Sequence, residues 1–179
     1  MPEPAELPRL ALDGGPGRPF PVLAAAYLRE YLDKVRLAVA KLDDDDVWFR
    51  PGGGTNSIGN LLLHLRGNLS LWLLGRVGGR AVERHRAAEF AADRSGGKAE
   101  LLDRLGEVVE EAAGILEALG DADLGRRLTV QGYETDLLSA LFHPVEHMSY
   151  HAGQIVWVAK QRLAARGVGI EFYPHHAGE

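Results

Sequence analysis

Three histidines spaced four residues apart, His143, His147 and His151, are the best candidates for chemistry in this sequence. Residues four apart on a helix lie one turn apart on the same side, so neighbouring imidazoles can point at one position. A divalent metal ion needs convergent ligands of this kind. The spacing therefore predicts a metal site, and the simpler alternative is a hydrogen-bonded row of polar side chains.

Helical phase turns the three histidines toward the protein interior, because large apolar residues flank them on both sides: Leu137, Met148, Tyr150, Ile155 and Trp157. A buried imidazole needs partners for both ring nitrogens. An earlier apolar stretch carries a second ladder of polar residues in steps of four: Asn60, His64 and Asn68. Two polar ladders on two helices predict one shared internal site.

His143 also belongs to a second motif, His143-Pro-Val-Glu146-His147, which has the H-x-x-E-H form of an inverted zinc protease. We interpret this match as accidental, because only 32 residues follow His147 and Pro144 strains the helix that would present both histidines. His143 lies two turns, about 12 Å, from His151, so one straight helix cannot bring all three rings to one ion.

The elements that must position these residues are helices, since apolar residues recur at steps of three and four in four stretches. The first helix begins near Phe20 and ends at the acidic run 43–46, which we expect to be solvated. The other three predicted helices have these limits: from a cap at Asn56 or Ser57 to Gly75–Gly79, from Leu101 to Gly120, and from a cap at Thr135 to about Arg166, before Gly167. No strand is expected. The fold class predicted is all-α, a four-helix bundle.

The chain has 179 residues, enough for one sizeable core. We expect a Pro- and Gly-rich arm at 1–19, the bundle at 20–167 and a tail at 168–179, without a further domain. The arginines of the 80–94 loop are most simply solvated, with anion binding as the alternative.

Composition excludes several classes of partner. The net charge of −5 offers no basic field for nucleic acid, and no stretch is apolar enough for a membrane span. The chain is expected to be soluble and cytoplasmic. Because it contains no cysteine, a metal must be held by nitrogen and oxygen, and any reacting thiol must come from another molecule.

The sequence resembles the DinB-like metal-binding proteins over roughly residues 20–166. Three segments carry the resemblance: Asn56-Ser-Ile-Gly-Asn-Leu-Leu-Leu-His64-Leu-Arg-Gly-Asn68 with Trp72, Arg86-Ala-Ala-Glu89-Phe90, and His147-Met-Ser-Tyr-His151-Ala-Gly-Gln154-Ile155. The family pattern joins a histidine of the second helix to an H-x-x-x-H pair of the last. It implies a DinB-like bundle in which His64, His147 and His151 bind the metal, and it leaves the role of His143 open.

The resemblance implies one divalent ion, for which zinc, nickel, copper and iron suit nitrogen ligands about equally. The activity it implies is that of a metal-dependent thiol S-transferase or isomerase, acting on a small-molecule substrate with a low-molecular-weight thiol. The alternative is a non-catalytic bundle in which the metal has a structural or ligand-sensing role. A homodimer is left open.

Overall fold

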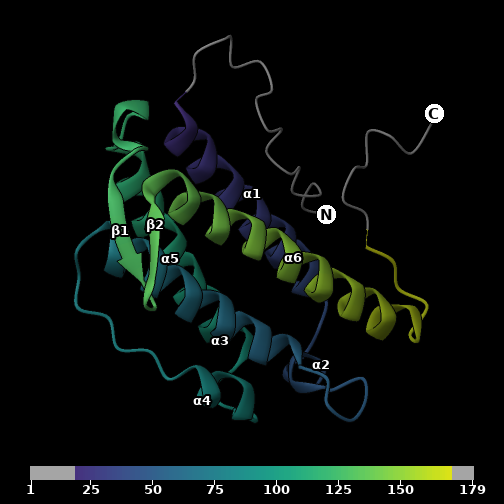
Figure 1. The fold of residues 1–179 in the computed structure, drawn as a ribbon. Helices are drawn as coiled ribbons and strands as arrows, with labels where there is room; N and C mark the ends of the chain where they lie inside the picture. The colour runs from purple at the N-terminus through teal and green to yellow at the C-terminus, as the bar shows by residue number, and fades with distance from the viewer. Residues whose placement is uncertain (1–18, 171–179) are drawn as a thin grey trace, which may run out of the picture.

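Four long helices surround one core in the computed structural model, which describes residues 19–170 (Figure 1). They are α1 (Phe20–Val39), α3 (Ile58–Leu69), α5 (Lys98–Glu117) and α6 (Leu137–Ala164). Helices α5 and α6 each pack against both α1 and α3. The predicted all-α four-helix bundle is therefore confirmed for the described part of the chain.

The core is built from the apolar stripes of these four helices, as their spacing predicts. Its largest fully buried side chains include Leu28 and Leu32 of α1, Leu62, Leu65 and Leu69 of α3, Leu105 and Leu116 of α5, and Leu141 and Met148 of α6. Each buried apolar side chain of this size stabilises the folded state by about 1.5–3 kcal/mol. The bundle therefore has a source of stability that does not depend on a bound ion.

Helix α3 begins where the sequence predicts, at Ser57. The Ser57 hydroxyl accepts a hydrogen bond from the Asn60 backbone N–H at 3.1 Å, and the Asn60 side chain accepts one from the Ser57 N–H, also at 3.1 Å. This reciprocal pair fixes the first turn of the helix. The helix continues past Leu69 as a π-helix, Ser70–Val77. It ends before Gly78, within the predicted end at Gly75–Gly79.

A β-hairpin lies between the third and fourth predicted helices. The prediction that the chain contains no strand is therefore wrong. Strand β1 (Arg127–Val130) pairs antiparallel with β2 (Tyr133–Asp136), with Val130 opposite Tyr133. The two residues between them, Gln131 and Gly132, have φ of 51° and 84°, the positive values that a tight hairpin turn requires. Strands of four residues are too short to show a clear alternation in the sequence.

The hairpin also moves the start of α6 by one residue from the predicted cap. Thr135 belongs to β2, and the Asp136 side chain instead accepts a hydrogen bond from the Ser139 backbone N–H at 2.8 Å. Helix α5 ends at Glu117, before the predicted stop at Gly120. Helix α6 ends at Ala164, and Gly167 follows with the positive φ of 69° expected of a helix stop.

The acidic run 43–46 forms a short helix, α2 (Asp44–Trp48), and is not simply solvated as predicted. Asp43 caps this helix, while Asp46 is completely buried and forms ion pairs with Arg162 and Arg166 of α6. We call Asp46, Arg162 and Arg166 the Asp46 cluster. It joins α2 to the C-terminal part of α6, 116 residues later in the chain.

The remaining described elements are α4 (Arg86–Ala91) and a single 3-10 turn, Asp121–Asp123. The predicted arm, apart from Pro19, and the predicted tail, apart from 168–170, lie outside the described residues. None of the described helices combines the length and the apolar character that crossing a bilayer requires.

Candidate metal centre

The two polar ladders predicted from the sequence face each other across α3 and α6. His64 lies on α3 and is only 3 % exposed, whereas His147 and His151 lie one turn apart on α6 and are half-buried. Trp72, beyond His64 in the chain, packs on His143, which precedes His147. The two helices are therefore antiparallel at the site.

His64, His147 and His151 each direct one ring nitrogen toward a common point. These three nitrogens all lie within 4.8 Å of one another. The Nε2 atoms of His64 and His147 are 3.1 Å apart, and the ring centroids of His147 and His151 are 4.5 Å apart. Three imidazoles at these separations are geometrically able to hold one metal ion, with further coordination positions left for other ligands.

Glu89 and Arg84 hold the His64 ring from its other side. Glu89 Oε2 lies 2.8 Å from His64 Nδ1, while Arg84 donates from Nε to Glu89 Oε1 at 2.7 Å and from Nη2 to Oε2 at 2.9 Å. Arg84 Nη2 is also 3.1 Å from His64 Nδ1. The arginine nitrogen can only donate, so we assign a proton to Nδ1 as well, and Glu89 Oε2 accepts from both nitrogens. A proton held on Nδ1 leaves Nε2 as a lone pair toward the other histidines.

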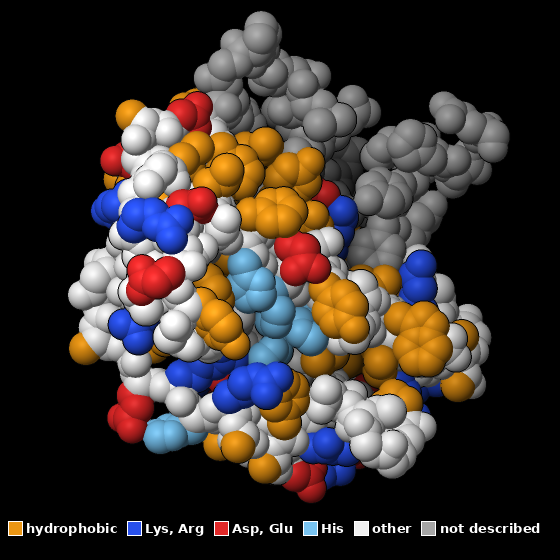
Figure 2. All heavy atoms as spheres, viewed as in Figure 1, with side chains coloured by type: hydrophobic (Ala, Val, Ile, Leu, Met, Phe, Trp, Pro, Cys, Tyr) orange, Lys and Arg blue, Asp and Glu red, His pale blue; other side chains and the backbone are white. Residues whose placement is uncertain are grey.

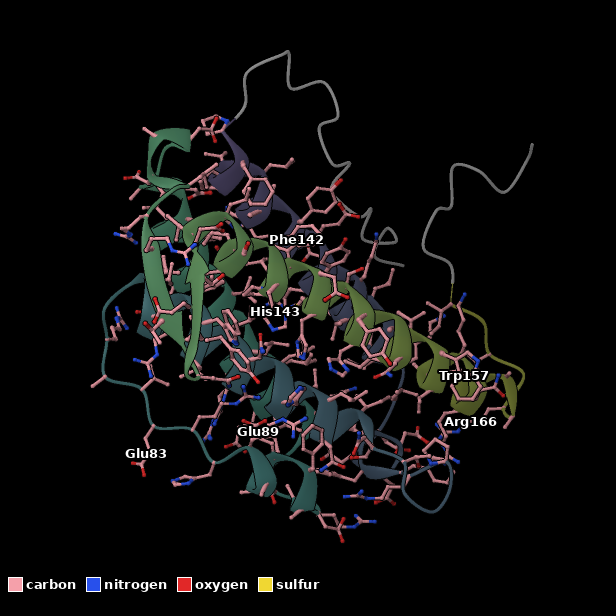
Figure 3. All side chains as sticks on the ribbon, viewed as in Figure 1. Glu83, Glu89, Phe142, His143, Trp157 and Arg166 are labelled. Atoms are coloured by element: carbon pink, nitrogen blue, oxygen red, sulfur yellow. The ribbon has the colours of Figure 1, made fainter. Side chains whose placement is uncertain are left out.

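The charge state of Glu89 supports this assignment. Burial alone would raise the pKa of the Glu89 carboxyl, but the hydrogen bonds from Arg84 and His64 outweigh it, so the pKa lies below its ordinary value. Glu89 is thus a carboxylate at neutral pH and accepts the hydrogen bonds of both neighbours. Figure 3 shows Glu89 rising from α4 toward α3.

A missing side chain on α3 makes room for Glu89. A Cβ added at Gly67 would collide with Glu89 Oε1 and come within 3.0 Å of Arg84 Nε. The glycine one turn after His64 therefore lets the Arg84–Glu89 pair lie directly against the helix. We call Arg84, Glu89 and Gly67 the Glu89 support.

His151 has a support of its own on α6. Its Nδ1 lies 2.8 Å from Oε1 of Gln154, three residues later, so the imidazole can donate to the amide oxygen and present Nε2 to the site. The Tyr150 ring packs edge-on against the His151 ring, with 5.1 Å between centroids. The glutamine that follows the H-x-x-x-H pair in the sequence therefore belongs structurally to the site.

His147 lies between the other two rings and is kept neutral. Burial, and then the neighbouring His151 and His64, lower the pKa of His147 from 6.5 to about 3. Burial also lowers the pKa of His151. Neutral imidazole is the form that binds metals, so no proton has to be displaced from these two rings at pH 7.

Hydrogen bonding alone does not complete the cluster. His147 Nδ1 is buried and has no hydrogen-bond partner among the described residues, and the same holds for Oδ1 of Asn68. Buried polar atoms are normally paired. These residues are therefore not satisfied by hydrogen bonds alone, and a donor set of three imidazole nitrogens on two helices fits a divalent ion.

His143 lies outside the group of convergent nitrogens. Its ring packs on Trp72, with 4.5 Å between centroids, and its centroid is 5.5 Å from that of His147. Burial lowers the pKa of His143. Figure 3 shows it on the side of α6 that faces α3, next to the site. The fourth histidine is thus a neighbour of the site, and Glu146 of the H-x-x-E-H motif is exposed.

Sequence reasoning missed the Glu89 support. The arginines of the 80–94 loop were expected to be solvated, but the Arg84 side chain is only 8 % exposed, so that prediction is wrong for Arg84. The nearest signal in the sequence is the Arg86 to Phe90 segment of the DinB-like pattern, which contains Glu89. Nothing in the spacing of Arg84 and Glu89 pairs them with a histidine on another helix.

We call His64, His147 and His151 the triad, and it is reachable from one face of the molecule through its half-buried members, His147 and His151. Figure 2 shows histidine side chains gathered at the centre of this face, with hydrophobic side chains on both sides of them and Lys or Arg side chains beside them. His85, by contrast, is an exposed group paired with Glu83.

Residues 18–166 match the model of one protein family, described as a protein of unknown function (DUF1572). The chain belongs to this family. No curated protein matches it.

Solved structures agree on the fold. A DinB-like protein from Bacillus cereus ATCC 10987 has a TM-score of 0.60 and 16 % identity, over 82 % of this chain and 94 % of that one. A conserved protein from Enterococcus faecalis has a TM-score of 0.66 and 15 % identity, over 80 % and 97 %. A DinB-like protein from Bacillus subtilis gives 0.62 and 16 %, over 84 % and 97 %. The DUF1572 chain therefore has the DinB-like fold, as the resemblance implied.

Proposed function

We propose that this protein binds one divalent metal ion through His64, His147 and His151 and uses it in thiol-dependent S-transfer to small electrophiles. The observation that carries the proposal is the convergence of three ring nitrogens within 4.8 Å, supplied by two rigid helices. The supports at Glu89 and Gln154 favour the same conclusion, because a metal-bound histidine typically donates its other N–H to such an acceptor.

Openness of the site favours a reaction over a purely structural role. Structural zinc sites are closed by four protein ligands, whereas three histidines with a free position are typical of sites that bind water or substrate. His147 and His151 are only half-buried, so a small molecule can approach them from solvent. The apolar core supplies stability that a structural ion would otherwise have to provide.

An external thiol is the natural co-substrate because the chain has no cysteine. A bound divalent ion would act as a Lewis acid and favour the thiolate form of that thiol. The thiolate sulfur forms a bond to the electrophilic carbon, the leaving group departs with its bonding electron pair, and the thiol proton passes to water. Glu89 and Gln154 keep the proton of their histidines on Nδ1 throughout.

The proposal is tested in two steps. Protein purified without a histidine tag is analysed for metals by mass spectrometry, and one ion per chain is expected in the wild type and none in His147→Ala. Loss of free thiol is then followed with a panel of electrophiles, and activity should need the ion and disappear in the same variant. A metal-free wild type that cannot be loaded would contradict the site. A loaded protein that turns over no electrophile would contradict the transferase activity and favour a structural or ligand-sensing role.

A further inference from the structure

A second feature of α6, a pair of exposed aromatic residues, lies beside the triad. Tyr150 and Trp157 are 60 % and 58 % exposed, although they are large aromatic residues in the middle of an ordered helix. Gly153 lies three residues after Tyr150 and four before Trp157, so all three share one side of α6. Figure 3 shows Trp157 on the outer side of this helix.

These residues line a cleft of about 590 Å³ between α6 and the loop that precedes α3. Leu61, Val158 and Pro51 contribute apolar surface, while Thr55, Asn56 and Gln154 contribute polar groups, and no lining residue carries a formal charge. Ligand sites for small molecules have this volume and this mixture of apolar walls with a few polar groups. Asn56 is free for such a role because Ser57 caps α3 in its place.

Gly153 forms the floor of this cleft. A glycine inside a helix lowers helix stability relative to alanine, so it usually marks a close contact. A Cβ at Gly153, however, would meet no atom within 4 Å, so packing within the described chain does not explain the glycine. Its effect is to keep the floor between the two aromatic side chains open. A flat ring placed there would lie over the glycine, between Tyr150 and Trp157.

Two residues that line the cleft also contact His151 of the metal centre. Gln154, which lines the cleft, holds Nδ1 of His151, and Tyr150, which forms one wall, packs against the same imidazole. We propose that this cleft binds the substrate through an uncharged, flat aromatic or conjugated group, and so presents its electrophilic carbon next to His151. The substrate role rests on the proposed function, whereas binding of such a group in the cleft does not.

The test uses N-phenyl-1-naphthylamine, an uncharged aromatic probe whose fluorescence rises in an apolar environment. We expect saturable binding to the wild-type protein. Gly153→Leu should weaken it about tenfold or more, because the new side chain fills the cleft, and Trp157→Ala should weaken it in the same direction by removing one wall. Thermal unfolding should show that Gly153→Leu is no less stable than the wild type, since leucine favours helix and meets open space.

Two matched controls are available. Gly114 of α5 is also a helical glycine whose Cβ would meet no atom within 4 Å, so Gly114→Leu adds the same side chain away from the cleft. Phe142→Ala removes another exposed aromatic residue of α6 that does not line it. Both should bind the probe like the wild type. No saturable binding to the wild type, unchanged binding to Gly153→Leu, or equal loss in the controls would overturn the proposal.

Metal analysis of the same samples separates the two proposals. Gly153→Leu should contain as much metal as the wild type, because it leaves all three histidines in place. If the wild type binds the probe in the expected pattern but holds no metal, the metal proposal fails and the cleft remains a binding site. If the metal is present and the probe pattern is absent, the cleft assignment fails alone.

Discussion

Two buried carboxylates are held by arginines in this protein, and they differ in what lies beyond them. Asp46 accepts from Arg162 at 2.8 Å and from Arg166, and its pKa is below the ordinary value because these hydrogen bonds outweigh the effect of burial. Glu89 accepts from Arg84 in the same way, but its second partner is the imidazole of His64.

The Asp46 cluster is chemically closed, because arginine has no lone pair to offer a ligand. At Glu89 the hydrogen-bonded chain ends in an imidazole whose far nitrogen faces two more imidazoles within 4.8 Å. One arrangement therefore joins α2 to α6 and does nothing more, whereas the other prepares a ring to bind something. An ion pair of this kind thus indicates a binding site when it leaves a nitrogen free to bind a ligand, as it does at His64.

The largest expected effect is the loss of metal from triad variants. His64→Ala, His147→Ala and His151→Ala should each reduce one-to-one metal content to background, while circular dichroism shows retained helix, because the apolar core is untouched. His143→Ala is the control and should keep the ion. If His143→Ala loses the ion while His64→Ala keeps it, the site is assigned to the wrong pair of rings.

Asp46→Ala should show the opposite pattern. It removes the hydrogen bonds of Arg162 and Arg166 to a buried partner, but both arginines are partly exposed and stay solvated, so we expect the free energy of unfolding in urea to fall by about 1–2 kcal/mol. Metal content should be unchanged. Loss of metal in this variant would mean that the two clusters are coupled and would break the comparison.

Changes to the Glu89 support should weaken metal binding without abolishing it. Glu89→Gln removes the charge that holds the proton on His64 Nδ1, and loss of such a partner typically costs about 10–100-fold in metal affinity. Gly67→Ala should act in the same direction, because its Cβ displaces the Glu89 carboxylate. Competition with a chromogenic chelator measures both. Gly114→Ala is the control, and a Gly67→Ala affinity equal to that of the control would remove Gly67 from the support.

The smallest effect expected is on pH dependence, since solvent reaches His147. In the metal-free protein its pKa is lowered from 6.5 to about 3, so the unfolded chain takes up a proton that the folded chain does not, and stability falls as the pH drops from 6.5 toward 3. The lowered pKa of Asp46 contributes stability that is present above pH 3.8 and is lost only as the pH falls below that value. When urea unfolding is measured across this range, the free energy of unfolding should change less with pH above pH 3.8 for His147→Ala than for the wild type. An unchanged slope would contradict a neutral His147 in the folded protein.

The sequence is a good guide to the bundle because long amphipathic helices repeat their apolar signal over many turns. It is also a good guide to the triad, since His147 and His151 are one turn apart and His64 lies on a matching ladder. The hairpin 127–136 escapes prediction for the opposite reason, because only Val130 of its two short strands is buried. Its Gln131-Gly132 turn is the one local signal.

Partners that meet only in three dimensions are the other part that the sequence conceals. Asp46 is one of four consecutive aspartates, and only the packing of α2 on the bundle separates it from its exposed neighbours. The D-x-x-D spacing of Asp43 and Asp46 is a recognisable capping pattern, but the arginine partners of Asp46 lie 116 and 120 residues away. Arg84 and Glu89 are close in sequence, yet nothing local aims them at His64.

The π-helix after α3 makes the register of one segment unusually dependent on chain length. Hydrogen bonds such as that from the Gly78 N–H to the Leu73 carbonyl, at 2.8 Å, span five residues instead of four, so this helix contains more residues per turn than an α-helix. Deleting one residue between 70 and 77 would let an ordinary α-helix form. An α-helix turns the chain further per residue than a π-helix does, so the two forms would leave Val77 in different directions and start the loop to Arg84 from different positions. The number of residues in this helix, and not only their composition, therefore helps to set where Arg84 and Glu89 meet His64.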